Sequence, residues 1–339
     1  MRSVKILAAA LFLGAAAAPL HAGSEPAAAC DRACLKQHMD GYLAALAARD
    51  PSAAGLASDV RFTENGQALS VGDGLWGTMS GLGTYRHDFV DPQNGQIAAF
   101  VSIREGKGKA ILTTRLKVRD GRIAEIETIV SRSDLGAGGM GEGPDRLDAM
   151  ARPEAIWSRP VARAERMSRE QLRETANAYF AGLERNDGKG YYPFSDDCER
   201  LENGFRTTNQ QERLALPGVD PNAEELPFAY EYMALGCKAQ FELGYYRFVD
   251  RIRDRRFPII DTETGTVFTF VFFDHSGTIP EVTLTDGRTV QTNLDRPYTW
   301  EMGEAFRIEG GKIRRIEAVM ASAPYGMPPN WPANGEDGE

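Results

Sequence analysis

Apolar residues recur at helical spacing near the start of each half of the chain, and they alternate at strand spacing further along. The patterns that repeat are two helix ends, 42–50 and 179–187, and two hairpins, 116–127 and 306–317. The hairpins turn at Asp120-Gly121 and Gly310-Gly311, dipeptides that favour two-residue turns. Each half is therefore predicted to begin with a helix and to end with a β-hairpin.

Two further matches lie between these elements and in the same order. The triplet Glu-Asn-Gly occurs at 64–66 and again at 202–204. A strand, a Gly-containing turn and a returning strand follow at 89–100 and at 259–270. Four ordered matches indicate a duplicated unit.

The N-terminus has the pattern of a secretory signal peptide. Arg2 and Lys5 precede a run of small apolar residues from Ile6 to Leu20, and a cleavage site is expected before Gly23. The run is too short for a stable membrane span. The mature protein is therefore expected to be periplasmic or secreted.

The repeat divides the rest of the chain. The predicted parts are a signal peptide at 1–22, a first domain at 30–133, a linker at 134–167, a second domain at 168–325 and a flexible tail at 326–339. Ser168 to Gln171 has the pattern of a capping box that opens the second domain. The second domain carries an insert at about 207–246 that contains Cys237 and several aromatic residues.

Charge and cysteine content restrict the function and the compartment. Without the signal peptide the chain has 37 basic and 48 acidic residues, a net charge of −11. This charge excludes the basic footprint of a nucleic-acid binder and the cationic face of a membrane-surface protein. The four cysteines allow three pairings. We expect Cys30–Cys34 and Cys198–Cys237, because each pair stays within one repeat.

Two segments of the repeat carry a resemblance to a known family: residues 42–50 followed by 59–66, and residues 119–127. They resemble the NTF2-like superfamily, most closely its SnoaL-like and ketosteroid-isomerase-like domains. The resemblance implies an α+β fold of two tandem cone-shaped domains, each a curved, mostly antiparallel sheet wrapped on helices. It also implies a conical pocket in which an acid at the end of the first strand is the general base.

That acid corresponds to Glu64 in the first repeat and to Glu202 in the second. Inside an apolar pocket its pKa would rise towards the range useful for proton transfer. The alternative is that the carboxylate accepts backbone N–H groups at the turn that Asn and Gly form. His87 is the candidate partner if it points inward, and Arg86 and Asp88 then lie on the opposite strand face. The second repeat aligns Phe257 with His87.

Further residues are candidates for substrate binding. Asn65 would position the substrate, and Trp76 and Arg86 would line or gate the pocket. Glu202 and Asn203 would do the same in the second repeat, which is either a degenerate partner of the first or a second binding site.

These candidates predict a cofactor-independent lyase, dehydratase or isomerase that acts on a small apolar or aromatic molecule. No serine-hydrolase elbow, zinc-protease motif or dinucleotide fingerprint is present, so no cofactor and no metal are expected. The expected partner is a small-molecule ligand, with no nucleic acid and no membrane. The protein is expected to be a monomer with pseudo-dimeric domains or a homodimer. The alternative is a non-catalytic exported ligand-binding or interaction protein, which a turn-capping Glu64 would favour.

Overall fold

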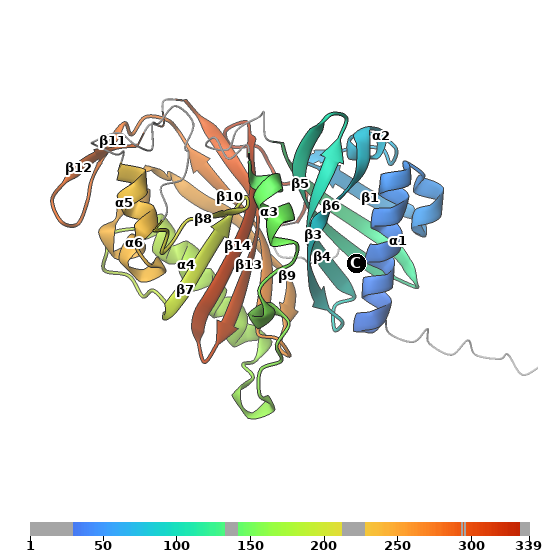
Figure 1. Cartoon of the computed structure of the whole chain (residues 1–339), viewed down its shortest axis with the longest axis horizontal. Helices are drawn as coiled ribbons and strands as arrows, with labels where there is room; N and C mark the ends of the chain where they lie inside the picture. The colour runs from blue at the N-terminus through green and yellow to red at the C-terminus, as the bar shows by residue number, and fades with distance from the viewer. Residues whose placement is uncertain (1–29, 133–141, 212–227, 293, 295, 333–339) are drawn as a thin grey trace, which may run out of the picture.

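The computed structural model describes residues 30–132, 142–211, 228–292, 294 and 296–332. Within these residues the chain is a mixed α+β protein with two six-stranded sheets (Figure 1). The strand orders are β2-β1-β6-β5-β4-β3 and β8-β7-β14-β13-β10-β9. The second order repeats the first strand for strand, which is compatible with two tandem domains.

The N-terminal half (residues 30–132) contains one long helix and the first sheet. Its elements are α1 (Arg32–Ala48), η1 (Pro51–Ala54), β1 (Leu56–Glu64), β2 (Gln67–Ala68), α2 (Leu75–Thr78), β3 (Met79–Asp91), β4 (Gln96–Glu105), β5 (Gly108–Arg119) and β6 (Arg122–Arg132). The strands β1 and β6 are parallel, and the other neighbours in this sheet are antiparallel.

The C-terminal half (residues 165–332) repeats this plan after a connecting segment. The connection contains α3 (Gly143–Met150), η2 (Ala155–Trp157) and η3 (Arg163–Glu165). The elements that follow are α4 (Arg169–Arg185), β7 (Phe194–Glu202), β8 (Phe205–Arg206), α5 (Phe228–Ala234), α6 (Cys237–Leu243), η4 (Tyr245–Phe248), β9 (Arg251–Asp261), β10 (Thr266–His275), β11 (Glu281–Thr283), β12 (Thr289–Gln291), β13 (Tyr298–Glu309) and β14 (Lys312–Ala323). Part of the predicted insert, residues 212–227, lies outside the described residues.

Local sequence signals account for the helix starts and the turns. The capping box is confirmed, because Ser168 accepts the Gln171 N–H and the Gln171 side chain accepts the Ser168 N–H. The predicted turns at 120–121 and 310–311 are confirmed too. Asn65-Gly66 and Asn203-Gly204 form equivalent turns, with all four residues at positive φ.

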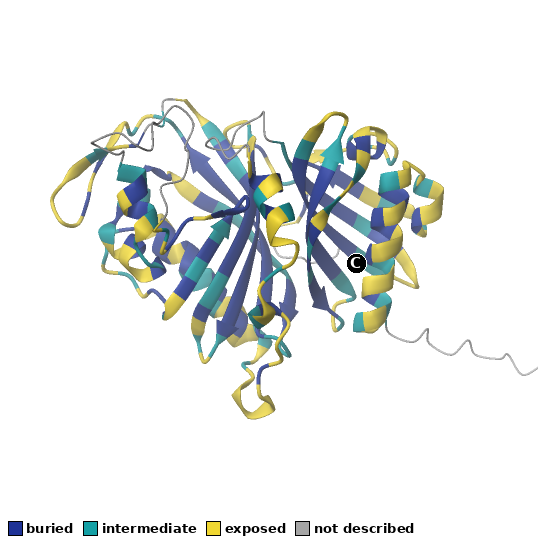
Figure 2. Ribbon diagram, in the orientation of Figure 1, coloured by how far each residue is buried: buried dark blue, intermediate teal, exposed yellow. Residues whose placement is uncertain are grey.

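Three apolar cores hold the fold together. The long helix α1 covers one face of the first sheet, and α4 covers one face of the second. The third core lies between the sheets, where Phe89 and Phe100 of the first meet Phe268 and Phe270 of the second. Figure 2 shows the strands buried in both sheets, while the outer sides of the helices are exposed. The face of each sheet that lacks its long helix is therefore buried by the other sheet.

The sheets lie close together at Gly303 of β13. A Cβ atom at this position would lie 2.6 Å from Thr113 Cγ2 of β5 and 3.2 Å from Phe268 Cζ. A distance of 2.6 Å is too short for a contact between two carbon atoms, so either the Gly303 backbone or the Thr113 side chain would have to move.

Both predicted disulfides are present. Cys30 bonds to Cys34, and Cys198 of β7 bonds to Cys237 at the start of α6. Two disulfides fit a protein of an oxidising compartment. Among the described residues, no helix is both long and apolar enough to cross a membrane.

The predicted flexible tail differs from expectation over residues 326–332. Trp331 is buried, and its Nε1 donates a 2.8 Å hydrogen bond to Thr63 Oγ1. The guanidinium groups of Arg61 and Arg115 lie 4.3 and 4.8 Å from its ring centre. The Trp331 ring and its indole N–H thus anchor part of the segment that was predicted to be flexible.

We expect Gly303→Ala to lower the free energy of unfolding by about 1–3 kcal/mol, because the new methyl group overpacks the interface. Thr113→Ser removes only the clashing Cγ2 and should restore most of the loss in the double variant. Urea unfolding of the two single variants and the double variant measures this coupling. Gly41→Ala in α1 is the control, because among the described residues its new Cβ meets no atom within 4 Å outside its own helix, and it should raise the stability through the higher helix propensity of Ala. Equal losses in Gly303→Ala and the double variant would contradict the close approach.

Candidate functional site

The predicted acid of the N-terminal half, Glu64, has structural hydrogen-bond partners on both of its carboxyl oxygens. It is 7% exposed, and its Oε2 accepts the Leu75 N–H at 2.6 Å. Its Oε1 accepts a 3.1 Å hydrogen bond from Arg132. Glu64 therefore holds the first N–H of α2 and pairs with a cation; this is a structural role, but at α2 rather than at the Asn65-Gly66 turn considered from the sequence.

The expected pairing of His87 with Glu64 does not occur. His87 Nδ1 lies 2.7 Å from Glu317 Oε2, on β14 of the other half. Strand alternation is the reason: Tyr85, His87 and Phe89 face the second sheet, whereas Arg86 bonds to Asp40 on α1. The condition for the pairing, that His87 points inward towards Glu64, is therefore not met.

The other predicted residues of the N-terminal half also have structural partners. Trp76 is buried and packs edge-on against Tyr42, with ring centres 5.5 Å apart. The Asn65 side chain accepts the Val130 N–H at 2.7 Å and donates to the Val130 carbonyl at 3.3 Å. Arg86 is held by Asp88 and Asp40. None of these groups is brought together with Glu64 as a site.

Asn203 makes the same contacts as Asn65, which identifies this contact as part of the repeated fold. Its side chain accepts the Met320 N–H at 2.9 Å and donates to the Met320 carbonyl at 3.1 Å. Glu202 is different, because it pairs with Arg200, a buried residue of the same strand.

Two positions under α4 carry charge where the N-terminal half does not. Arg200 is opposite Ile316, as Phe62 is opposite Ile126, so Arg200 replaces a phenylalanine. Glu304 is opposite Ala318, as Thr114 is opposite Thr128, so Glu304 replaces a threonine. The first sheet folds with uncharged residues at both places. The fold itself therefore does not require these two charges.

The charged residues belong to a buried polar cluster, defined here as Arg200, Glu202, Glu304, Gln240, Tyr179, Tyr232 and Tyr246. Arg200 donates to Glu202, to Gln240 Oε1 at 2.9 Å and to the Tyr246 hydroxyl at 3.3 Å. Tyr179 on α4 lies beneath it, with the guanidinium carbon 5.9 Å from the ring centre. The insert contributes Gln240 and two of the tyrosines, so it completes this cluster.

Glu304 is the most unusual member of the cluster. It is 0% exposed, and among the described residues neither carboxyl oxygen has a hydrogen-bond partner of normal geometry. The pKa of Glu304 is raised to about 8, chiefly by burial; the charge of Glu202 adds to the rise, and Arg200 and the Tyr179 hydroxyl oppose it. At neutral pH Glu304 is therefore a protonated acid.

Other members of the cluster also have unused hydrogen-bonding atoms. Arg200 Nε, the Tyr232 hydroxyl and the neighbouring Thr207 hydroxyl are buried and have no hydrogen-bond partner of normal geometry within the part of the chain that the structure describes. Burial raises the pKa of Tyr232 well above its ordinary value, so this hydroxyl remains a donor. Buried polar groups are normally satisfied, and a ligand is one way to satisfy several that converge.

A second buried carboxyl, Glu301, lies on the opposite face of β13. Burial and the charge of Glu127 raise its pKa to about 8, while Arg256 opposes the shift. Its charged neighbours are groups of the interface between the sheets, not the cluster around Arg200. It therefore forms no part of the same site.

Sequence patterns alone missed Arg200 and Glu304. Each interrupts an otherwise apolar face, and a residue-by-residue comparison of the two repeats was the available signal. For metals, the group among the described residues that could converge on an ion is Cys30, Cys34 and His38. Its two sulfurs are bonded to each other, so they do not act as thiolate ligands.

The protein is a mixed α+β protein in which one sheet plan occurs twice, and the C-terminal copy carries the buried polar cluster. Residues 28–130 and 165–320 match the family model described as "Domain of unknown function (DUF8021)", and the chain belongs to this family. Each matched range contains one long helix and most of one six-stranded sheet.

The remaining comparisons add little. A search of curated proteins finds no match. Among solved structures, the chain is similar to a de novo designed protein with a curved β-sheet, at 16% identity and a TM-score of 0.26, over 30% of this chain and 88% of that one. It is also similar to an LEH-like epoxide hydrolase of M. tuberculosis, at 16% identity and a TM-score of 0.22, over 29% and 84% of the two chains. At these TM-scores neither match bears on activity.

We expect Glu64→Gln to lower the free energy of unfolding by about 1–3 kcal/mol, because it weakens a buried charge-assisted contact to Leu75 and Arg132. Asp59→Asn on the same strand is the matched control. Its ion pair with Arg119 is exposed, so its loss should stay within about 0.5 kcal/mol. Chemical unfolding of both variants decides the point, and a Glu64→Gln protein as stable as the control would rule out the structural role.

Proposed function

We propose that this protein is an exported, cofactor-independent lyase, dehydratase or isomerase, and that its chemistry takes place at the buried polar cluster of the C-terminal half. Two tandem NTF2-like domains would carry this site. The shared strand order and the single long helix on one face of each sheet support that fold.

The observation that carries the proposal is the unpartnered, protonated Glu304 beside the Arg200–Glu202 ion pair. A buried carboxyl without a hydrogen bond costs several kcal/mol of stability. Thr114 at the equivalent position shows that the sheet forms without it. A costly group that the fold does not need is best explained by function.

The two carboxyls are suited to opposite roles. Glu202 is held by the Arg200 guanidinium and acts as the base, whereas Glu304 carries a proton and acts as the acid. In a dehydration, Glu202 removes a proton from carbon, and the electrons of that bond form the new double bond. Glu304 gives its proton to the departing hydroxyl group, which leaves as water. In an isomerisation, Glu202 returns its proton to a different carbon.

The neighbouring groups support this chemistry. The unpartnered Nε of Arg200 and the Tyr232 hydroxyl are donors for a substrate oxygen on which negative charge develops. The aromatic rings of Tyr179, Tyr232 and Tyr246 favour a small apolar or aromatic substrate.

The N-terminal half supports the alternative of a non-catalytic role for that half. Glu64 caps α2, and Trp76 is buried against Tyr42. In this proposal the N-terminal half supplies the sheet that buries the outer face of the C-terminal sheet, and the C-terminal half carries the chemistry.

To test this, a panel of small aromatic β-hydroxy ketones is screened with the mature protein, and the conjugated product is followed by its absorbance. We expect Glu304→Gln and Glu202→Gln each to lower turnover by about 10²–10⁴-fold, because each removes one proton transfer. Glu304→Gln should remain folded with a stability close to that of wild type, since it replaces a neutral buried acid by a neutral amide of the same shape.

Glu64→Gln is the matched control, because it alters the equivalent carboxyl of the other half. It should retain turnover after correction for the folded fraction. Turnover that survives in Glu304→Gln, or that is lost in Glu64→Gln instead, would refute the assignment to the C-terminal half.

A further inference from the structure

The interface between the sheets contains two equivalent carboxylates with different partners. Glu127 on β6 and Glu317 on β14 each follow the isoleucine that pairs with the first strand of their sheet. Both are buried, and both reach the opposite half. Glu127 accepts hydrogen bonds from Arg256, whereas Glu317 accepts them from Tyr85 and His87.

The structure shows that His87 and Arg256 are equivalent residues. His87 is opposite Phe100 in its sheet, and Arg256 is opposite Phe270. The sequence alignment placed Phe257 there, but the β9–β10 register shifts beside this position, so the equivalence moves by one residue. The interface thus has a permanently charged arginine on one side and a histidine, which can exchange a proton, on the other.

The partners of His87 define which of its nitrogens is free. Burial and the Glu317 carboxylate raise the pKa of Tyr85, so its hydroxyl keeps the proton and donates to Glu317 Oε1 at 2.8 Å. Glu317 Oε2 then accepts the Nδ1 proton of His87 at 2.7 Å. In the neutral ring this leaves Nε2 as a hydrogen-bond acceptor, as in other carboxylate-oriented imidazoles.

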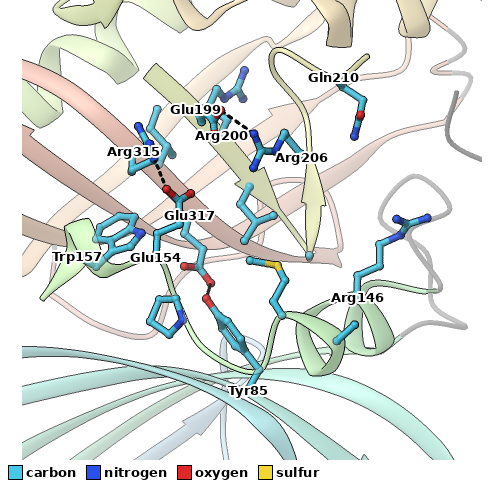
Figure 3. Close-up of a pocket in the computed structure, with 16 residues that line it drawn as sticks. Tyr85, Arg146, Glu154, Trp157, Glu199, Arg200, Arg206, Gln210, Arg315 and Glu317 are labelled. Carbon is cyan, nitrogen blue, oxygen red and sulfur yellow. Dashed lines mark hydrogen bonds and ion pairs between the residues drawn. The ribbon is translucent and has the colours of Figure 1, made fainter. Parts of the chain in front are cut away.

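Tyr85, His87 and Glu317 lie between a cavity and a groove. Tyr85 and Glu317 line a cavity of about 270 Å³ between the halves (Figure 3). His87 lines a larger groove of about 930 Å³. Met150, Pro153, Glu154 and Trp157 border both, so the connecting segment between the halves forms the shared wall.

The groove has aromatic walls and no excess of charge. Phe89 and Trp157 flank His87, with ring centres 4.1 and 4.7 Å from the imidazole. The groove is lined by four cations and four carboxylates: Arg32, Lys36, Arg86, Arg152, Asp88, Glu154, Asp261 and Glu263. Balanced charge does not select an ionic ligand. The groups that distinguish this part of the groove from its charged rim are two aromatic rings and the imidazole of His87.

We propose that this groove is a second binding site, separate from the cluster around Glu304, and that it takes a neutral phenol whose hydroxyl group donates to His87 Nε2. Glu317 and Tyr85 are positioning residues, because they fix the imidazole and reach the ligand only through it. Phe89 and Trp157 bind the aromatic ring.

The probes are 2-naphthol and 2-methoxynaphthalene, which share a ring system and differ in the donor. Calorimetry on the full mature chain should show 2-naphthol binding about tenfold more tightly, the effect of one hydrogen bond. His87→Phe should abolish this preference, and Glu304→Gln should leave it intact.

A measurement on the wild-type protein keeps the test valid if His87→Phe does not fold. Imidazole ¹⁵N NMR should show Nδ1 protonated in the neutral ring, and 2-naphthol should shift the Nε2 resonance of His87. Equal affinity for the two probes, no binding of either, a proton on Nε2 instead, or a preference lost in Glu304→Gln rather than in His87→Phe would each overturn the proposal.

Discussion

Each six-stranded sheet is apolar on both faces, and its long helix covers only one of them. Every residue of β10 is buried, for example, although α4 lies on a single side of it. The second face would expose a large apolar surface if the halves separated. Packing the two sheets on each other removes both surfaces from water at once (Figure 1). The rest of the molecule, including the position of His87, depends on this contact.

Charged groups on this apolar background are informative because burying them is costly. Most are compensated: Glu127 binds two arginines, Glu317 binds Tyr85 and His87, and Glu202 binds Arg200. Among the described residues Glu304 has no ion pair and no hydrogen bond of normal geometry, and only the Arg200 charge and the Tyr179 hydroxyl favour its ionised form. Burial makes the ionised form of Glu304 unfavourable, and this keeps the carboxyl protonated at neutral pH. A protonated acid beside a paired carboxylate is the arrangement that proton transfer needs.

The sequence was sufficient for features set by local chemistry or by the repeat. The hairpins at 120–121 and 310–311, the Ser168 capping box and both disulfides follow from neighbouring residues or from the need to stay within one repeat. The partner of His87 was not accessible in this way, because alternation shows which residues share a strand face but not which face meets the other half. Trp331 was missed for a similar reason, since its contacts with Thr63, Arg61 and Arg115 lie more than two hundred residues away.

The central claim is that Glu304 is held as a protonated acid, and a direct titration tests it. The side-chain carboxyl carbons of ¹³C-labelled glutamates are followed by NMR from pH 4 to pH 10, at roughly half-unit steps. Glu304→Gln identifies its resonance and separates it from that of Glu301. The account predicts a midpoint of about 8 for Glu304. A midpoint near the ordinary value of 4.5 would mean that Glu304 is charged at neutral pH, and the acid role assigned to it would be wrong.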